Sequence, residues 1–286
     1  AGIDGREGGK GEQPAHSRPL RDPAPSVGLD MAHENLLERL IPVARQAGQA
    51  ILAVYAGAFA ARRKADDSPV TDADLAAEAI IVDALARLAP GVPVVSEESA
   101  SEGEAPAVGG CFWLVDPLDG TREFVDRNGE FTVNIALVIA GEPVLGVVHA
   151  PALGELHAGE RGRGAFVEAG GRRSPVRCAA PRAGGLVAVS SRSHGAADAL
   201  ERFLRGREVA ATIGVGSSLK FCRVARGEAD LYPRLGPTME WDTAAGQAVL
   251  VAAGGRVVTL AGEPLRYGKP GFANPPFVAA GLAEAL

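Results

Sequence analysis

The stretch CFWLVDPLDGTREF, Cys111–Phe124, decides how this sequence is interpreted. Its apolar run, Phe112–Val115, has the length and composition of a buried strand and leads directly into Asp116 and Asp119. Two carboxylates that end a buried strand are hard oxygen ligands, which suit Mg²⁺ or Mn²⁺ better than zinc and favour a substrate phosphate in the remaining positions. The stretch therefore predicts a divalent-cation site.

The same letters also fit a plain turn. Pro117 removes a backbone donor and Gly120 permits a tight path, so we expect the chain to leave regular structure between them. Turns built from Asp, Pro and Gly are common without any chemical role. The rest of the chain has to decide between the two interpretations.

The composition is that of an ordinary globular protein. The chain has 286 residues, of which 47% are hydrophobic, so it can bury a large core. Its net charge of −6 and its few aromatic residues argue against a nucleic-acid polymer as partner. Its three cysteines form no CxxC pair, which argues against a disulfide framework or a zinc site and favours the cytoplasm. No apolar run approaches the roughly 20 residues of a membrane span, and a peripheral association with the inner membrane is compatible with the sequence.

The patterning divides the chain into three regions. Residues 1–30 are rich in Gly, Pro and charge, which predicts a disordered leader or an extension ahead of Met31. Residues 31–180 predict an α+β metal-binding half, with two helices on one face of a largely antiparallel sheet. Residues 181–286 alternate between strand and helix and predict an α/β half that completes the active-site cleft.

Further acids stand at the ends of predicted elements. Glu97 follows a short strand over residues 92–95, and Asp242 opens the helix EWDTAAGQAVLVAAGG. Asp74 stands three residues after Thr71, a near capping box at the start of the second helix. Each acid alone fits a structural role, as a loop acid, a helix N-cap or a cap partner. If Glu97, Asp116, Asp119 and Asp242 converge, however, they predict a site for two or more Mg²⁺ ions that supports hydrolysis of a small phosphomonoester.

Other phosphate chemistries fit less well. A cysteine phosphatase needs an arginine six positions after its cysteine, where this chain has Pro117, Gly184 and Glu228. An aspartyl-phosphate enzyme needs DxDx(T/V), and Leu118 stands where the second Asp would be. No P-loop pattern occurs, and no GxGxxG follows a strand. The predicted nucleophile is therefore water.

The motifs SPVTDAD, SEES, WLVDPLDGT and EWDTAAG, in this order, resemble the Mg²⁺-dependent, lithium-sensitive phosphatase superfamily that includes inositol monophosphatase and fructose-1,6-bisphosphatase. More narrowly, DGTREFVDRNGEFTVNIALV, VAVSSRSH, GSSLKFCRVARGEADLYPRLGPTMEWDTAAG and NPPF resemble the bacterial CysQ type of 3'(2'),5'-bisphosphate nucleotidase. The likeness covers nearly all of residues 34–280. It implies an α/β fold, an α+β layered sandwich with alternating α-β-α-β-α layers.

The resemblance also implies roles for matching residues. Two or three Mg²⁺ ions, or Mn²⁺ as a substitute, would be held by Glu97, Asp116, the carbonyl of Leu118, Asp119 and Asp242. Asp74 and Thr121 would orient and deprotonate the attacking water. The backbone of Gly120 and Thr121 would hold the phosphate, which the metal-side residues would also contact. Candidates for the second phosphate and the nucleoside are Lys64, Arg192, His194, Ser217, Ser218 and Lys220.

The implied reaction is hydrolysis of 3'-phosphoadenosine 5'-phosphate to AMP and phosphate, within sulfur assimilation. The 5'-phosphosulfate form is a further candidate substrate. The segment ATIGVGSSLK is two residues longer around Gly214–Gly216 than the pattern expected of nucleotidases. Three alternatives stay open: an inositol monophosphatase, a related sugar phosphatase, and a catalytically silent nucleotide-binding protein. A homodimer is compatible with the sequence.

Overall fold

The computed structural model describes residues 2, 35–57, 62–63, 69–181, 183–192 and 197–282. The expected leader, apart from Gly2, and the candidates Lys64 and His194 lie outside the described residues. The chain from Asn35 to Leu286 forms one compact unit. In the described part of the chain, no helix is long and apolar enough to cross a membrane.

Two sheets form the frame of this unit. The larger sheet has seven strands in sequence order, antiparallel except for the parallel pair β3 and β4. Its strands are β3 (Val94–Ser96), β4 (Cys111–Asp119), β5 (Thr132–Ile139), β6 (Glu142–Ala150), β7 (Glu155–Glu160), β8 (Gly164–Ala169) and β9 (Arg172–Val176). The smaller sheet has the order β11 (Val209–Val215), β10 (Leu186–Ser191), β12 (Leu231–Arg234), β16 (Phe277–Ala280) and β14 (Arg256–Thr259).

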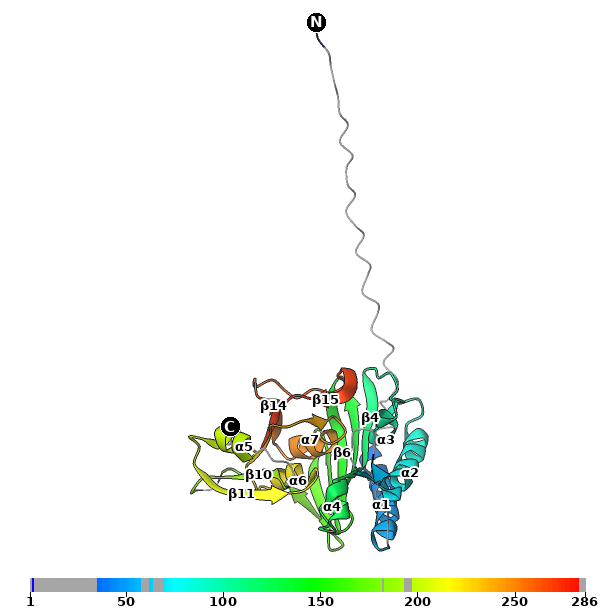
Figure 1. Ribbon diagram of the computed structural model, residues 1–286, viewed down its shortest axis with the longest axis horizontal. Coiled ribbons are helices and arrows are strands. Elements are labelled where there is room, and N and C mark those ends of the chain that lie inside the picture. The colour runs from blue at the N-terminus through cyan, green and yellow to red at the C-terminus, as the bar shows by residue number, and fades with distance from the viewer. Residues whose placement is uncertain are drawn as a thin grey trace. The chain divides into compact units, whose positions relative to one another are not determined.

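Helices occupy three layers around these sheets (Figure 1). The pair α1 (Leu36–Tyr55) and α2 (Asp72–Leu88) covers one face of the larger sheet and shares a core with it. Helices α6 (Leu219–Ala225) and α7 (Ala244–Ala252) lie between the two sheets, in a second core that both sheets line. Outer helix α5 (Ala197–Leu204) packs on the far face of the smaller sheet. The expected α-β-α-β-α layering is confirmed.

The remaining elements are short. Helices α3 (Glu97–Ser101) and α4 (Thr121–Val125) follow β3 and β4, and two ribbons pair β1 (Arg62–Arg63) with β2 (Pro69–Val70) and β13 (Thr238–Met239) with β15 (Ala273–Asn274). A 3₁₀ turn, η1, spans Pro270–Phe272. β5 and β6 form a hairpin, whose turn places Ala140 and Gly141 at φ of 52° and 75°.

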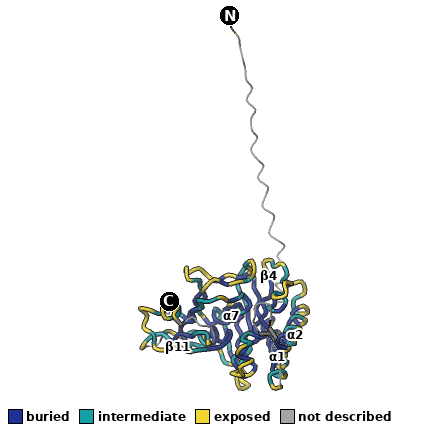
Figure 2. Tube along the Cα trace, viewed as in Figure 1, coloured by how far each residue is buried: buried dark blue, intermediate teal, exposed yellow. Residues whose placement is uncertain are grey.

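Central helix α7 is buried along most of its length because two glycines let it approach the larger sheet closely (Figure 2). A Cβ added to Gly146 on β6 would lie 2.7 Å from the carbonyl oxygen of Ala245, and one on Gly159 of β7 would lie 2.7 Å from the Cα of Val249. Any side chain at either position would push the helix away. The glycines therefore fix where the segment before α7 meets the end of β4.

Candidate active site

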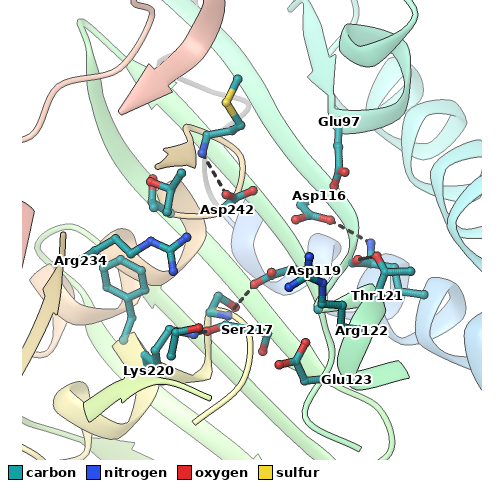
Figure 3. Close-up of a pocket in the computed structure, with 18 of the residues that line it drawn as sticks. Glu97, Asp116, Asp119, Thr121, Arg122, Glu123, Ser217, Lys220, Arg234 and Asp242 are labelled. Carbon is teal, nitrogen blue, oxygen red and sulfur yellow. Dashed lines mark hydrogen bonds between the residues drawn. The ribbon is translucent and has the colours of Figure 1, made fainter. Parts of the chain in front are cut away.

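A pocket opens where the ends of several elements meet, and it brings together most of the acids singled out in the sequence (Figure 3). It receives residues from the ends of β3, β4, β10 and β12, from the loop before α6, and from the segment before α7. Its charged lining residues are Glu97, Asp116, Asp119, Arg122, Glu123, Lys220, Arg234 and Asp242. The volume accessible to water is about 360 Å³. Both sheets contribute, so the pocket depends on how they are stacked.

A bulge in β4 places Asp116 and Asp119 on the same face of the sheet. Alternation along a regular strand would turn residues three apart to opposite faces. Here Asp116 pairs with Asn134 and Asp119 with Thr132, so β4 fits three steps against two of β5. The strand continues through Pro117 and ends at Asp119, so regular structure ends between Pro117 and Gly120, as expected. The unpaired stretch absorbs the proline, which has no ladder donor to offer.

Leu118 shows the effect of the bulge on its own side chain. This side chain is 1% exposed and packs in the core under α1 and α2, whereas Phe112 and Leu114 pack toward α6 and α7. The backbone of Leu118 is therefore what reaches the pocket, and its carbonyl oxygen lies 3.4 Å from the Thr121 hydroxyl. Its N–H donates to Asp116 Oδ1 over 3.0 Å.

The loop before α6 closes on Asp119. The Ser218 N–H donates to Asp119 Oδ2 over 2.5 Å, and the Asn134 amide lies 3.4 Å from the same oxygen. The Ser218 hydroxyl donates to Asn134 Oδ1 over 2.7 Å and lies 2.9 Å from the hydroxyl of Thr132. These bonds join the loop before α6 to β4 and β5 and orient one oxygen of Asp119.

Glu97 and Asp242 reach the pocket from segments that are far apart in the sequence. Because β3 runs parallel to β4, the two strands end at the same edge of the sheet, and Glu97 is the first residue of α3 after β3. Asp242 accepts the Met239 N–H over 2.9 Å. The position of Asp242 in the sequence suggested the N-cap of α7, but the N-cap is Thr243. The carboxylate of Asp242 is thus directed into the pocket (Figure 3).

Burial raises the pKa of the three aspartates, and their neighbours add to the effect. The pKa of Asp116 lies well above its usual range because the group is desolvated and because Glu97, Asp119 and Asp242 repel its charge. Desolvation is also the main cause for Asp119, whose pKa rises to about 6, and for Asp242, whose pKa rises to about 8. Neighbouring acids contribute in both cases. This cluster is costly to ionise without a counter-charge.

A divalent cation would supply that counter-charge, and the donor set fits it. The candidate donors are carboxylate or carbonyl oxygens, the ligands of Mg²⁺ and Mn²⁺, and among the described residues neither His nor Cys lines the pocket. Within the described ranges, no three His, Cys, Asp or Glu side chains already enclose a common point closely enough to hold an ion. Binding would therefore draw the carboxylates inward from positions in which they repel one another.

Two cationic side chains line the side of the pocket opposite Glu97 and Asp116 (Figure 3). Lys220 is 5% exposed, and its ammonium donates to the carbonyls of Val215 and Ser217 over 3.2 Å and 2.5 Å. Burial lowers its pKa to about 8, against the opposing effect of Asp119. The second cation, Arg234, was not singled out in the sequence. Nothing in ADLYPRL distinguishes it from a solvent-facing arginine at the end of a strand.

The other candidates lie at varying distances from this pocket. Gly120, Thr121, Ser217 and Ser218 line it. Asp74 does not line it: this residue is 1% exposed, and its carboxylate accepts the backbone N–H and the hydroxyl of Thr71 over 2.8 Å and 2.7 Å, which completes the capping box. Arg192 also lies outside the lining, where it forms an ion pair with Glu130 and donates to the carbonyl of Gly214.

Similarity to known proteins agrees with this geometry. The chain is 49% identical over 246 residues to the 3'(2'),5'-bisphosphate nucleotidase CysQ of Salmonella typhimurium, covering 85% of this chain and 98% of that protein. It is 40% identical over 252 residues to the protein of the same name from Buchnera aphidicola, covering 86% and 94% of the two chains.

Solved structures and a family model agree in turn. The crystal structure of CysQ from Bacteroides thetaiotaomicron, described as a bacterial member of the inositol monophosphatase family, is 38% identical with a TM-score of 0.73, covering 87% of this chain and 98% of that one. An inositol monophosphatase from Thermotoga maritima is 27% identical with a TM-score of 0.70, covering 85% and 91%. The model of the inositol monophosphatase family matches residues 32–286. This chain belongs to the inositol monophosphatase family.

Proposed function

We propose that this chain is a Mg²⁺-dependent 3'(2'),5'-bisphosphate nucleotidase of the cytoplasm, which hydrolyses 3'-phosphoadenosine 5'-phosphate to AMP and phosphate. The observation that carries the proposal is the convergence of buried, mutually repelling carboxylates beside cations in one pocket. Its nucleotide specificity is supported by relatives that carry this name, one of which is 49% identical. Enzymes of this family are metal-dependent phosphatases that generally use Mg²⁺.

The two halves of the fold would have different tasks. In the first half, Glu97, Asp116, Asp119 and the Leu118 carbonyl would hold the metal, and Asp242 from the second half would close the site. When bound, two or three Mg²⁺ ions would neutralise the phosphate and lower the pKa of the attacking water. The cations Lys220 and Arg234, also from the second half, would face the rest of the substrate.

The chain's own groups would orient the reaction. The Thr121 hydroxyl and the backbone of Gly120 and Thr121 line the pocket next to Asp119, where they would hold the scissile phosphate and the attacking water. Asp74 lies outside the lining, so it would accept the water's proton through the Thr121 hydroxyl, which lines the pocket. Attack on phosphorus breaks the bond to the 3'-oxygen, which leaves as a hydroxyl after it takes up a proton.

The direct test is phosphate release by the purified chain with Mg²⁺. Equal concentrations of 3'-phosphoadenosine 5'-phosphate, inositol 1-phosphate and fructose 1,6-bisphosphate should show a clear preference for the nucleotide. Preference for inositol 1-phosphate would keep the metal chemistry and reject the nucleotide specificity. Release from none of them, with a folded protein and Mg²⁺ present, would favour the silent binding protein. The 5'-phosphosulfate form can be assayed alongside as a second nucleotide substrate.

A further inference from the structure

The segment Gly214–Ser218 ends β11 and leads into α6, and its conformation decides how Asp119 is oriented. Its last residue, Ser218, donates its N–H to Asp119 Oδ2. The residue before it, Ser217, has a φ of 48°, in the left-handed region that residues with a side chain rarely adopt. A strained backbone of this kind persists only where the surrounding structure enforces it. The bonds that hold the segment are therefore part of how the site is built.

Anchors reach this segment from both halves of the fold. From α6, Lys220, which lies near Ser217 in Figure 3, donates to the carbonyls of Val215 and Ser217. From the first half, Glu130 Oε2 accepts the Gly216 N–H over 2.7 Å in a partly buried bond. A Cβ added to Gly216 would lie 2.9 Å from both the Cβ and the carbonyl oxygen of Glu130, so the segment lies directly against this residue. Glu130 thus joins the segment to the first half.

Arg192 completes the anchor that Glu130 begins. It follows β10, and its guanidinium donates to both carboxylate oxygens of Glu130 over 2.9 to 3.1 Å and to the carbonyl of Gly214 over 2.9 Å. The pair therefore bonds the segment at two points, the carbonyl of Gly214 and the N–H of Gly216. Around these two glycines the segment is also longer than the pattern expected of nucleotidases.

Glu130 also continues a row of polar side chains that begins on β5. Residues two apart on a strand point to the same face, and Thr132 and Asn134 are two apart on β5. Their side chains contact the Ser218 hydroxyl at 2.9 Å and 2.7 Å. Glu130 stands two residues before Thr132 and contacts Gly216, two residues before Ser218. The row thus follows the segment along its length, and Glu130 holds the end farther from Asp119.

We propose that Glu130 is a positioning residue: together with Arg192 it holds the segment Gly214–Ser218 so that the Ser218 N–H orients Asp119. This inference rests on the proposed function, in which Asp119 holds a cation. The alternative is a surface ion pair without a role in the site, because the Arg192 side chain is 50% exposed and such pairs contribute little. That alternative leaves the bond from Gly216 to Glu130 unexplained.

The first test is hydrogen exchange of backbone amides in EDTA, measured by NMR, which needs neither metal nor substrate. Glu130→Ala should speed exchange at Gly216 and Ser218 by more than about 10-fold, because the segment loses its anchor. The amides of α7 should keep their rates, whereas a general loss of stability would speed them by the same factor. The matched control is Glu38→Ala, since Glu38 accepts two bonds from one arginine, Arg173, on the surface.

Two milder variants separate the two bonds of Glu130. Glu130→Gln keeps an oxygen for the Gly216 N–H and should restore most of the protection from exchange. Arg192→Met removes the ion pair but leaves the Gly216 bond, so its effect at Ser218 should lie between those of Glu130→Ala and wild type. If Glu130→Ala unfolds, Arg192→Met still decides: wild-type exchange at Ser218 would overturn the inference.

The second test separates kcat from KM for 3'-phosphoadenosine 5'-phosphate. A misplaced Asp119 should lower kcat of Glu130→Ala by about 10- to 100-fold and change KM by less than about 3-fold, because Glu130 lies outside the pocket lining. Glu130→Gln should recover most of kcat, and Glu38→Ala should match wild type. An unchanged kcat in Glu130→Ala, or unchanged exchange at Ser218, would overturn the inference. If wild type releases no phosphate, the proposed function fails, and the exchange rates in EDTA still decide whether Glu130 positions the segment.

Discussion

Metal-free protein should lose stability as the pH rises, because its pocket carboxylates hold their protons more tightly in the folded state than in the unfolded chain. A group with a raised folded pKa contributes stability that is complete below its unfolded pKa and is lost as the pH passes its folded pKa. The unfolded value is about 4, and the folded values are about 6 for Asp119 and about 8 for Asp242. The loss should therefore develop between about pH 4 and pH 8.

The magnitude follows from the shift of Asp119 alone. The pKa of Asp119 rises by about two, from about 4 to about 6, which corresponds to about 3 kcal/mol of unfolding free energy. Since 1 kcal/mol shifts the melting temperature of a chain of this size by about 2–4 °C, that temperature should fall by roughly 6–12 °C. Bound Mg²⁺ would compensate the ionised carboxylates, so its stabilising effect should be larger at about pH 8 than at about pH 5.

The assay is thermal unfolding in EDTA and in Mg²⁺ across this pH range, for wild type, Asp119→Asn and Asp83→Asn. Asp83 is 66% exposed and pairs with Arg87, so its substitution controls for the loss of a carboxylate on the surface. Asp119→Asn should reduce the pH-dependent loss in EDTA, whereas Asp83→Asn should follow wild type. Parallel curves for wild type and Asp119→Asn, or a Mg²⁺ effect independent of pH, would refute the reasoning.

Three further predictions concern single substitutions. Asp119→Asn should abolish phosphate release while the circular dichroism spectrum stays native; retained turnover would reject the assignment of Asp119 as a metal ligand. Gly146→Ala should cost about 1–3 kcal/mol of stability and weaken Mg²⁺ binding, because the added Cβ would displace α7 and with it Asp242. Gly109→Ala, where the added Cβ meets nothing within 4 Å, is its control, and equal effects in calorimetry would contradict the argument. Thr71→Val should lower the free energy of unfolding by about 1 kcal/mol through the lost cap. It should also lower kcat more than it changes KM, because Asp74 Oδ2 loses the hydroxyl that orients it. An unchanged kcat of the folded enzyme would show that the effect is purely structural.

Helices, their caps and the candidate metal ligands were the features that could best be predicted from the sequence. Periodicity and capping residues predicted α1 and α2, and the Thr71–Asp74 capping box is present. Glu97, Asp116, Asp119 and Asp242 could be proposed to converge because each stood next to a strand or helix end. The five-layer arrangement, by contrast, came from the family resemblance, since periodicity supports only a mixed class.

What the sequence did not reveal depended on contacts between distant segments. The bulge in β4 appears only in the pairing with β5, so the sequence did not reveal that the strand continues through Pro117. Asp242 had the spacing of a helix cap, and only its bond to the Met239 N–H shows that it serves elsewhere. Arg234 gave no signal in the sequence, because only the folded chain brings it into the pocket.

The bulge in β4 also restricts how this segment can change in length. The two residues between Asp116 and Asp119 provide the single extra step that turns both carboxylates to one side. Removing one residue there would restore ordinary alternation, which still turns carboxylates two positions apart to one side, but the unpaired stretch through which the Leu118 backbone reaches the pocket would be lost. A substitution at position 118 keeps this backbone oxygen, because every residue carries a carbonyl, whereas a single-codon deletion would spare both aspartates and still take the oxygen away from the pocket.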